Sequence, residues 1–276
     1  MRVALAGCGV VGSELTRIIG RQAADCEVVR VLVRDTGKER SVPVARNLFT
    51  DDVDDFLSCE ADVVVEAIGG FDPSHQIARA TLARGARFVT ANKALIAQSG
   101  DELLALARTT GGRIDFEAAV GGGIPVIRSL RNSLRNTRVQ SIAGILNGTT
   151  NYILTRIEQG ETFDEALSQA QENGFAEADS SRDLNGTDSA DKLRILAWIA
   201  FGVRPAELHV EVRGILPNPE QLVSEAKHQG GCLRLIAQCE RTADGVRASV
   251  APTIVPLDSA FARNVDEQNL ISIDLG

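Results

Sequence analysis

Histidine and cysteine, the usual ligands of transition metals, are scarce in this sequence of 276 residues. There are three histidines and five cysteines, and no Cys-x-x-Cys pair occurs among them, so the sequence gives little support for a zinc site or a similar metal site. The cysteines also lack the even, framework-like spacing of a disulfide-linked secreted domain. We therefore expect reduced thiols and a cytoplasmic protein.

Long basic runs and long apolar runs are missing as well. The sequence has 29 Lys and Arg against 37 Asp and Glu, a formal net charge of −8, and this balance disfavours a polyanionic partner such as nucleic acid. No apolar run approaches the roughly 20 residues of a membrane-spanning helix. An apolar strand at the very start leaves no room for a signal peptide. We expect neither a nucleic-acid partner nor a membrane partner.

The residues that are present indicate an α/β protein. Apolar residues make up 44% and charged residues 24% of the chain, which is ordinary for a globular protein. In the first half, short apolar strands alternate with helical stretches, as in a parallel sheet wound on both sides. These strands are expected at 2–6, 28–33, 62–66, 87–90 and 113–116.

We expect two domains, a Rossmann-type doubly wound parallel sheet over 1–127 and an α/β domain over 128–276. The second half has a Thr162-x-x-Glu165 capping box, which predicts a helix start. It also has a hairpin pattern, with strands at 232–240 and 246–255. Further strands are expected at 138–146 and 270–273, and helices at 124–134 and 218–229. The second domain is thus predicted to hold a mixed sheet with helices on one side, a common platform for pairing with a second subunit.

A glycine-rich loop, Gly7-Cys8-Gly9-Val10-Val11-Gly12, lies between the first strand and a helix expected from about Val11 to Ile19. In this context such glycines allow a tight turn and a close approach of the backbone to a pyrophosphate at the helix N-terminus. The alternative is a turn that only packs the helix on the strand. The dinucleotide contacts are expected from Gly7, Gly9, Val10, Val11 and Gly12.

The second strand ends at Arg34-Asp35, about twenty residues after the glycines, where such folds bind the ribose. Asp35 can accept a hydrogen bond from a 2′-hydroxyl, which favours NAD(H). Arg34 and Lys38 can bind a 2′-phosphate, which favours NADP(H). We expect NADP(H) to be preferred, while use of NAD(H) stays open.

Two further strands end in segments suited to the cofactor edge. The strand at 62–66 runs into Gly69-Gly70, and the strand at 87–90 is followed by Lys93. Because ligands bind at the carboxyl ends of parallel strands, we expect Gly69, Gly70 and Lys93 to contact the cofactor. A lysine judged without this context would be a solvated side chain.

The strand at 113–116 leads into Glu117 and then into the triplet Gly121-Gly122-Gly123. Three glycines leave the backbone carbonyls free to face an ion or a ligand. A tight crossing from a strand to a helix explains the same residues equally well.

The stretch from 174 to 202 combines several charged residues with an almost wholly apolar helix. A helix that is apolar on all sides is expected to be buried. Its loop contains Glu177, Asp179, Arg182 and Asp183. Thr187 or Asp188 is expected to cap the helix, which should end before Gly202.

Asp188 and Lys192 lie four residues apart on one face of that helix. An exposed ion pair is one interpretation. The other is a lysine at the mouth of a buried helix, facing a cavity in which nearby acids receive an amino-acid substrate.

Taken together, these motifs resemble those of the homoserine dehydrogenases. The resemblance runs from residue 1 to about 274 and rests on the glycine-rich loop and on VRDTGK, TANKALIA, EAAVGGGIPVI, GILNGTTNYIL, GFAEADSSRDLNGTDSADKL and VAPTIVP in that order. It implies the reversible reduction of L-aspartate 4-semialdehyde to L-homoserine by NAD(P)H, on the route to threonine, methionine and isoleucine. It also implies a homodimer formed through the second domain.

The resemblance further implies residue roles. Lys192 matches the proton-transferring lysine, with Asp188 beside it, and Lys93 matches the second active-site lysine. The substrate pocket corresponds to Glu177, which holds the amino group, and to Asp183, Gly148 and Thr149. A monovalent cation, sodium, corresponds to the backbone oxygens of Glu117, Val120, Gly122 and Ile124.

Members of this family normally continue past the strand at 270–273, whereas this sequence stops at Gly276. We expect a monofunctional form without a C-terminal regulatory domain. Loss of the tail would uncover one side of the cofactor site, and weakened or abolished turnover stays open as a consequence. Two other interpretations stay open. One is a related dehydrogenase of another small amino acid or semialdehyde, and the other is a cofactor-binding homologue without catalysis.

Overall fold

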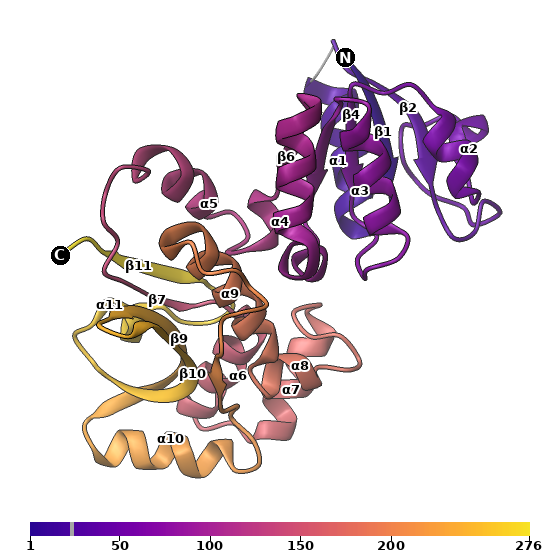
Figure 1. Cartoon of the computed structure of the whole chain (residues 1–276). Coiled ribbons are helices and arrows are strands. Elements are labelled where there is room, and N and C mark those ends of the chain that lie inside the picture. The colour runs from indigo at the N-terminus through magenta and orange to yellow at the C-terminus, as the bar shows by residue number, and fades with distance from the viewer. Residues whose placement is uncertain (23–24) are drawn as a thin grey trace. The chain divides into compact units, whose positions relative to one another are not determined.

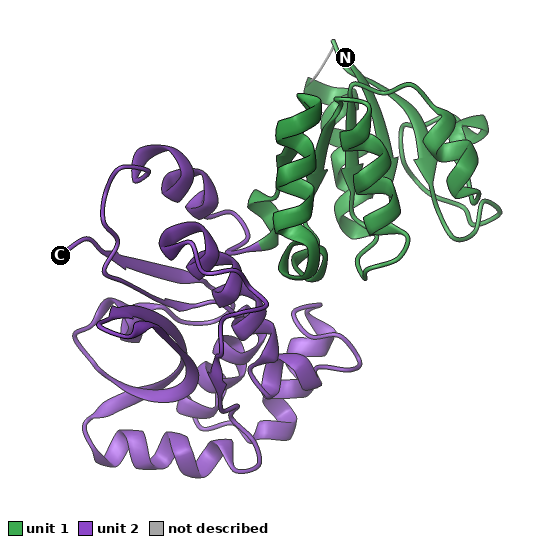
Figure 2. Cartoon of the chain, viewed as in Figure 1, with its two compact units in different colours: residues 1–119 green, residues 120–276 purple. Residues whose placement is uncertain are grey.

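The structure, a computed structural model, describes residues 1–22 and 25–276. These residues fall into two units, Met1–Ala119 and Val120–Gly276 (Figure 2). This division precedes the domain boundary expected after residue 127, so the glycine triplet and the following helix belong to the second unit.

The first unit is built on a six-stranded sheet in which every strand pair is parallel (Figure 1). Its strand order is β3-β2-β1-β4-β5-β6. The strands are β1 Arg2–Ala6, β2 Glu27–Leu32, β3 Phe49–Thr50, β4 Val63–Glu66, β5 Arg87–Thr90 and β6 Arg113–Asp115. The chain moves outward from β1 in one direction and from β4 in the other, so the order reverses between them. Such a switch point is where doubly wound sheets bind ligands.

The helices of this unit confirm the doubly wound α/β expectation. They are α1 Val10–Gln22, α2 Val53–Ser58, α3 Ser74–Ala83 and α4 Lys93–Thr110, with 3-10 turns η1 Arg46–Leu48 and η2 Glu117–Ala119. Residues Val3 to Ala6 are at most 3% exposed, because β1 lies in the middle of a sheet covered on both faces. The short elements β3 and α2 were not expected from the sequence.

The second unit contains the predicted mixed sheet, in the order β11-β7-β9-β10-β8. Its strands are β7 Ser141–Ile145, β8 Glu211–Val212, β9 Gly231–Thr242, β10 Gly245–Pro256 and β11 Leu270–Asp274. All pairs are antiparallel except β8 with β10. The long hairpin β9–β10 is confirmed, and the two-residue β8 was not expected.

Eight helical elements complete this unit. They are α5 Val126–Arg128, η3 Ser129–Ser133, α6 Gly148–Glu158, α7 Phe163–Glu172, α8 Ser181–Leu184, α9 Thr187–Phe201, α10 Pro219–His228 and α11 Ala260–Arg263. The helices α6, α9 and α10 pack on β9. Leu233, Leu235 and Ala237 of β9 are buried, and by strand alternation they lie on the face opposite to Cys232 and Ile236, which pack against α11.

Three local predictions need correction. The helix expected at 124–134 starts at Val126 and turns π-helical from Ser129. The expected loop over 174–186 contains the helical turn α8. Neither Thr187 nor Asp188 caps α9, because Gly186 occupies the cap position in a left-handed conformation that suits glycine. The capping box of Thr162 and Glu165 is confirmed.

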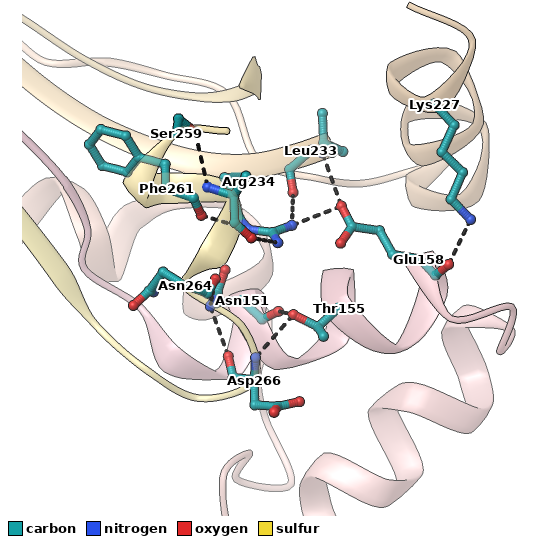
Figure 3. Close-up of polar contacts among 11 residues, drawn as sticks. Asn151, Thr155, Glu158, Lys227, Leu233, Arg234, Ser259, Phe261, Asn264 and Asp266 are labelled. Atoms are coloured by element: carbon teal, nitrogen blue, oxygen red, sulfur yellow. Dashed lines mark hydrogen bonds and ion pairs between the residues drawn. The ribbon is translucent and has the colours of Figure 1, made fainter. Parts of the chain in front are cut away.

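A buried arginine ties the C-terminal segment to the sheet (Figure 3). Arg234 is 1% exposed, and its guanidinium donates to Glu158 Oε1 at 2.8 Å. The same group donates to the carbonyl oxygens of Phe261 at 3.3 Å and Ala262 at 3.1 Å. A buried guanidinium needs such acceptors for its many donors, so Arg234 joins α6, β9 and α11.

The residues after α11 are hydrogen-bonded to α6 (Figure 3). Asn151 Nδ2 donates to the carbonyl oxygens of Asp266 at 2.9 Å and Asn264 at 3.2 Å. Asp266 has φ 57°, and its N–H donates to Thr155 Oγ1 at 3.1 Å. An aspartate tolerates this left-handed conformation better than most residues, and the turn brings the chain from α11 back toward β11.

In the parts of the chain that the structure describes, no helix combines the length and the apolarity needed to cross a bilayer.

Candidate active site

Lys192 is held in a polar group at the start of α9. Its ammonium nitrogen lies 2.7 Å from Asp188 Oδ2 and donates to the carbonyl oxygen of Leu146, also at 2.7 Å. The side chain of Lys192 is 19% exposed and that of Asp188 is 8% exposed. The interpretation as a solvent-exposed pair therefore does not hold. The lysine is largely buried and faces the turn that follows β7.

The side chain of Asn147 is hydrogen-bonded to two acids near this lysine. Its Nδ2 donates to Asp183 Oδ1 at 2.6 Å and to Asp188 Oδ2 at 2.8 Å. Its Oδ1 accepts from the N–H of Thr150 at 2.8 Å and so caps α6. One side chain thus starts a helix and places two carboxylates.

Sequence reasoning did not include Asn147 among the site residues. The asparagine appeared there only within the motif GILNGTTNYIL. The N-cap position of this asparagine could have identified it, because an asparagine there can accept a hydrogen bond with its oxygen and still donate with its amide nitrogen.

Gly148 and Thr149, expected in the substrate pocket, open helix α6 beside this group. Thr149 Oγ1 donates to the carbonyl oxygen of Phe175 at 2.5 Å. A Cβ added to Gly148 would lie 2.5 Å from the carbonyl oxygen of Glu267. Packing against the 264–268 turn therefore explains the glycine without a ligand.

Two expected acids are placed differently. Asp183, on α8, belongs to the Asn147 group. Glu177 is exposed between α7 and α8, and its carbonyl oxygen accepts from Gln171 Nε2 at 3.5 Å. The structure does not bring the Glu177 side chain into the buried group around Lys192.

The first unit has a cavity of about 780 Å³ at the carboxyl edge of its sheet. It includes six of the residues expected to bind a dinucleotide: Gly7, Gly9, Arg34, Lys38, Gly69 and Gly70. It lies beside the switch point between β1 and β4. Val10 and Val11, also expected there, are exposed at the start of α1.

The glycine positions fit a bound dinucleotide. A Cβ on Gly12 would lie 2.1 Å from the carbonyl oxygen of Gly7, so close packing of α1 requires a glycine there. A Cβ on Gly9 would meet no atom within 4 Å in the part of the chain that the structure describes. The protein alone thus gives no reason for glycine at position 9, whereas a ligand lying against the backbone does.

Asp35 is engaged in its own turn. Its Oδ1 accepts from the N–H groups of Gly37 at 2.8 Å and Lys38 at 3.3 Å. Arg34, Asp35 and Lys38 all line the cavity. Two basic residues thus border the cavity beside Asp35, and one carboxylate oxygen of Asp35 shapes the loop that carries Lys38.

Lys93 is the first residue of α4, directly after the N-cap residue Asn92. It is not among the residues that line the cavity. Its position at the end of β5 nevertheless agrees with the expected place at the sheet edge, since β5 pairs with β4 in parallel.

The expected cation residues come from consecutive turns. Glu117 lies in η2, at the end of the first unit, whereas Val120, Gly122 and Ile124 open the second unit. Gly121 and Gly122 have φ 76° and 58°. Near Gly122 lies the amide of Asn269, with its Nδ2 3.9 Å from the place of an added Cβ. The buried Asn269 Oδ1 accepts no hydrogen bond from the described residues.

An unpartnered buried oxygen beside a glycine turn suits a hard monovalent cation, because such ions prefer oxygen donors. In the described residues, no group of three or more His, Cys, Asp or Glu side chains could hold a metal. A site built from carbonyl oxygens does not need such a group.

Comparison with known proteins matches both units to one family. The family model for the homoserine dehydrogenase NAD binding domain matches residues 7–117, and the model for homoserine dehydrogenase matches residues 125–275. The homoserine dehydrogenase of Bacillus subtilis is 39% identical over 266 residues, which cover 93% of this chain and 61% of that protein. The chain thus spans about three fifths of that relative.

Solved structures agree with this result. A homoserine dehydrogenase from Thiobacillus denitrificans has a TM-score of 0.90 at 35% identity, over 99% of this chain and 66% of that one. A hyperthermophilic archaeal homoserine dehydrogenase in complex with NADPH has a TM-score of 0.82 at 26% identity, over 99% of this chain and 87% of that one. With family models that match most of both units, this chain belongs to the homoserine dehydrogenase family.

Proposed function

We propose that the protein catalyses the reversible NAD(P)H-dependent reduction of L-aspartate 4-semialdehyde to L-homoserine. The observation that carries the proposal is the largely buried side chain of Lys192, whose ammonium group is held by Asp188 and by the Leu146 carbonyl. Family membership supports the same reaction.

Lys192 supplies the proton. NADPH, when bound, supplies the hydride, so the aldehyde oxygen gains negative charge that an ammonium group stabilises and then neutralises. A lysine ammonium has three donors, and the described contacts use two of them. The third is available to the aldehyde oxygen. Asp188 orients the ammonium, and in the reverse direction Lys192 takes the proton from the alcohol.

The amino-acid end of the substrate needs acids for its ammonium and N–H donors for its carboxylate. Asp183 lies in the group around Lys192, and Gly148 and Thr149 open α6, whose N-terminus favours an anion. Glu177 is assigned to the substrate ammonium, which requires the exposed segment between α7 and α8 to move inward on binding. Lys93 assists and contacts the cofactor.

The preferred cofactor is NADP(H). Arg34 and Lys38 line the cavity of the first unit, and one Asp35 oxygen is occupied by two backbone N–H groups. A 2′-phosphate would find two basic side chains there. Gly7, Gly9, Val10, Val11 and Gly12 bind the pyrophosphate, and Gly69, Gly70 and Lys93 line the remainder of the site.

Three further features complete the proposal. Sodium binds at the backbone oxygens of Glu117, Val120, Gly122 and Ile124, and stabilises that turn. The protein forms a homodimer through the mixed sheet of its second unit. It works in the cytoplasm, in agreement with five cysteines that are all free.

Oxidation of NADPH with L-aspartate 4-semialdehyde tests the proposal directly, when it is followed at 340 nm beside a full-length relative. Turnover with the semialdehyde, and none with other small aldehydes, is the expected result. NADPH binding without turnover at high protein concentration would contradict the catalytic assignment and leave a cofactor-binding homologue.

A further inference from the structure

The carboxylate of Glu66 is enclosed at the carboxyl end of β4. Glu66 is 0% exposed, and its Oε1 accepts from the N–H groups of Ile68 at 2.8 Å and Gly69 at 2.9 Å. The same oxygen accepts from Ser74 Oγ at 3.1 Å. Oε2 accepts from Thr90 Oγ1 at 2.5 Å. A buried carboxylate that receives four donors is a strong local constraint, and Oε2 depends on Thr90 alone among the described donors, so loss of that hydroxyl would leave it unsatisfied.

These contacts continue into a closed ring. Thr90 Oγ1 accepts from the N–H of Asn92 at 2.9 Å, and Asn92 Nδ2 donates to the carbonyl oxygen of Gly70. Gly70 follows Gly69, whose N–H returns to Glu66. The ring thus joins the loop after β4 to the residue that caps α4.

The loop side of the ring borders the proposed cofactor site. Ile68, Gly69 and Gly70 line the 780 Å³ cavity, and Gly69 and Gly70 hold φ 77° and 75°. A Cβ at either glycine would meet no atom of the described residues within 4 Å, so no packing contact fixes the loop at these two positions. Hydrogen bonds hold the loop instead, from Ile68 and Gly69 to Glu66 and from Asn92 to Gly70.

We propose that Glu66, acting through Thr90 and Asn92, is a positioning residue that sets the Ile68–Gly70 wall of the cofactor site and the start of α4 at Lys93. This inference rests on the proposed function. Glu66 is fully enclosed and is not among the residues that line the cavity, so its effect passes through the backbone of the loop.

Thr90 offers the sharpest test, because valine has nearly the shape of threonine but no hydroxyl. Thr90→Val leaves Glu66 Oε2 without its donor, while Thr90→Ser keeps that donor. Thr81→Val is a matched control, since Thr81 is 0% exposed on α3 and its hydroxyl has no partner among the described residues. NADPH affinity is measured by fluorescence titration of the whole chain, together with Tm and steady-state kinetics.

Loss of one hydrogen bond to a buried carboxylate corresponds to about tenfold in an equilibrium constant. We therefore expect Thr90→Val to raise the Kd and the KM for NADPH by about tenfold, with little change in the KM for the semialdehyde. Thr90→Ser and Thr81→Val should stay near the unsubstituted chain. Should Thr90→Val not fold, Ser74→Ala removes a weaker donor to the same carboxylate and should give roughly a threefold rise in Kd.

Equal NADPH affinity of Thr90→Val and Thr90→Ser would overturn the inference and leave the proposed function intact. A fall in Tm with unchanged affinity would also overturn it, because it would show a purely structural role. Failure of the unsubstituted chain to bind NADPH would instead overturn the proposed function, and this assignment with it.

Discussion

The ammonium nitrogen of Lys192 lies 2.7 Å from the carbonyl oxygen of Leu146, although 46 residues separate the two in sequence. A backbone carbonyl does not titrate, so this acceptor does not change with pH. It also fixes the lysine relative to the turn at Asn147 and Gly148, which begins directly after Leu146.

Replacing Lys192 tests its role in proton transfer. Lys192→Ala should lower kcat by about two to four decades, the usual contribution of a positioned acid or base, with the Kd for NADPH unchanged. Lys227→Ala is the matched control, because Lys227 also donates to a backbone carbonyl but is exposed on α10. A Lys192 variant with near-normal kcat would refute the assignment.

Asn147 should contribute to both stability and activity. Asn147→Ala removes the cap of α6, at a cost of about 0.5–2 kcal/mol, and leaves Asp183 and Asp188 without the amide that both accept from. We expect a rise in the KM for the semialdehyde in addition to a lower Tm.

Thr162→Ala separates these two effects, because it removes a similar cap from α7. It should lower the Tm comparably while the KM stays unchanged. If the two variants had the same kinetics, Asn147 would be only a helix cap.

Arg34 should control the choice of cofactor. Because a charged hydrogen bond to phosphate would be lost, Arg34→Ala should lower kcat/KM for NADPH by roughly tenfold and change kcat/KM for NADH little. Arg21→Ala, at the far end of α1, serves as the control for general loss of positive charge. An equal loss with both cofactors would contradict a 2′-phosphate contact.

The ion pair of Arg234 and Glu158 should be important for stability. Arg234→Met leaves the partly buried carboxylate of Glu158 without its ion-pair partner and the α11 carbonyl oxygens without a donor. The free energy of unfolding in urea should therefore fall by about 3–5 kcal/mol. The exposed pair of Arg247 and Glu240, 3.6 Å apart on the same hairpin, gives the comparison. Arg247→Ala should cost at most about 1 kcal/mol. If both variants lost a similar free energy of unfolding, burial of the ion pair would not determine its contribution to stability.

The thiol of Cys239 should make stability depend on alkaline pH. Burial raises the pKa of this thiol from 9.0 to about 12. Below pH 9 the thiol is protonated in both states, and the full contribution to stability is present. Between pH 9 and about 12 only the unfolded chain ionises, so the free energy of unfolding falls as the pH rises.

Urea titrations at several alkaline pH values measure this slope, and Cys239→Val should reduce it. The buried Cys239 should also react slowly with thiol reagents in the folded protein, because the thiolate is the reactive form. Rapid modification of native Cys239 at pH 8 would contradict this expectation.

Local signals were sufficient for much of the fold. The period of apolar residues and the turn residues predicted the parallel sheet, the β9–β10 hairpin and the helix at 218–229, which the structure has as α10 Pro219–His228. The same signals failed where an element was short or was set by its surroundings. Phe49–Thr50 forms a strand only because it pairs with Val31 and Leu32, and two residues carry no periodicity of their own.

The features of the site also divide into those that local sequence predicted and those that only the folded chain revealed. The sequence by itself determined which residues have suitable chemistry. These are a lysine one turn after an aspartate, a glycine loop after a strand, and basic residues after the next strand. Each of these motifs can be recognised because its residues lie only a few positions apart. Only the tertiary structure decided that Lys192 is buried against Leu146, that Asn147 joins two acids, and that Glu66 supports the Ile68–Gly70 loop. Those relationships depend on burial and on contacts between distant segments, and packing, unlike local pattern, is a property of the whole chain.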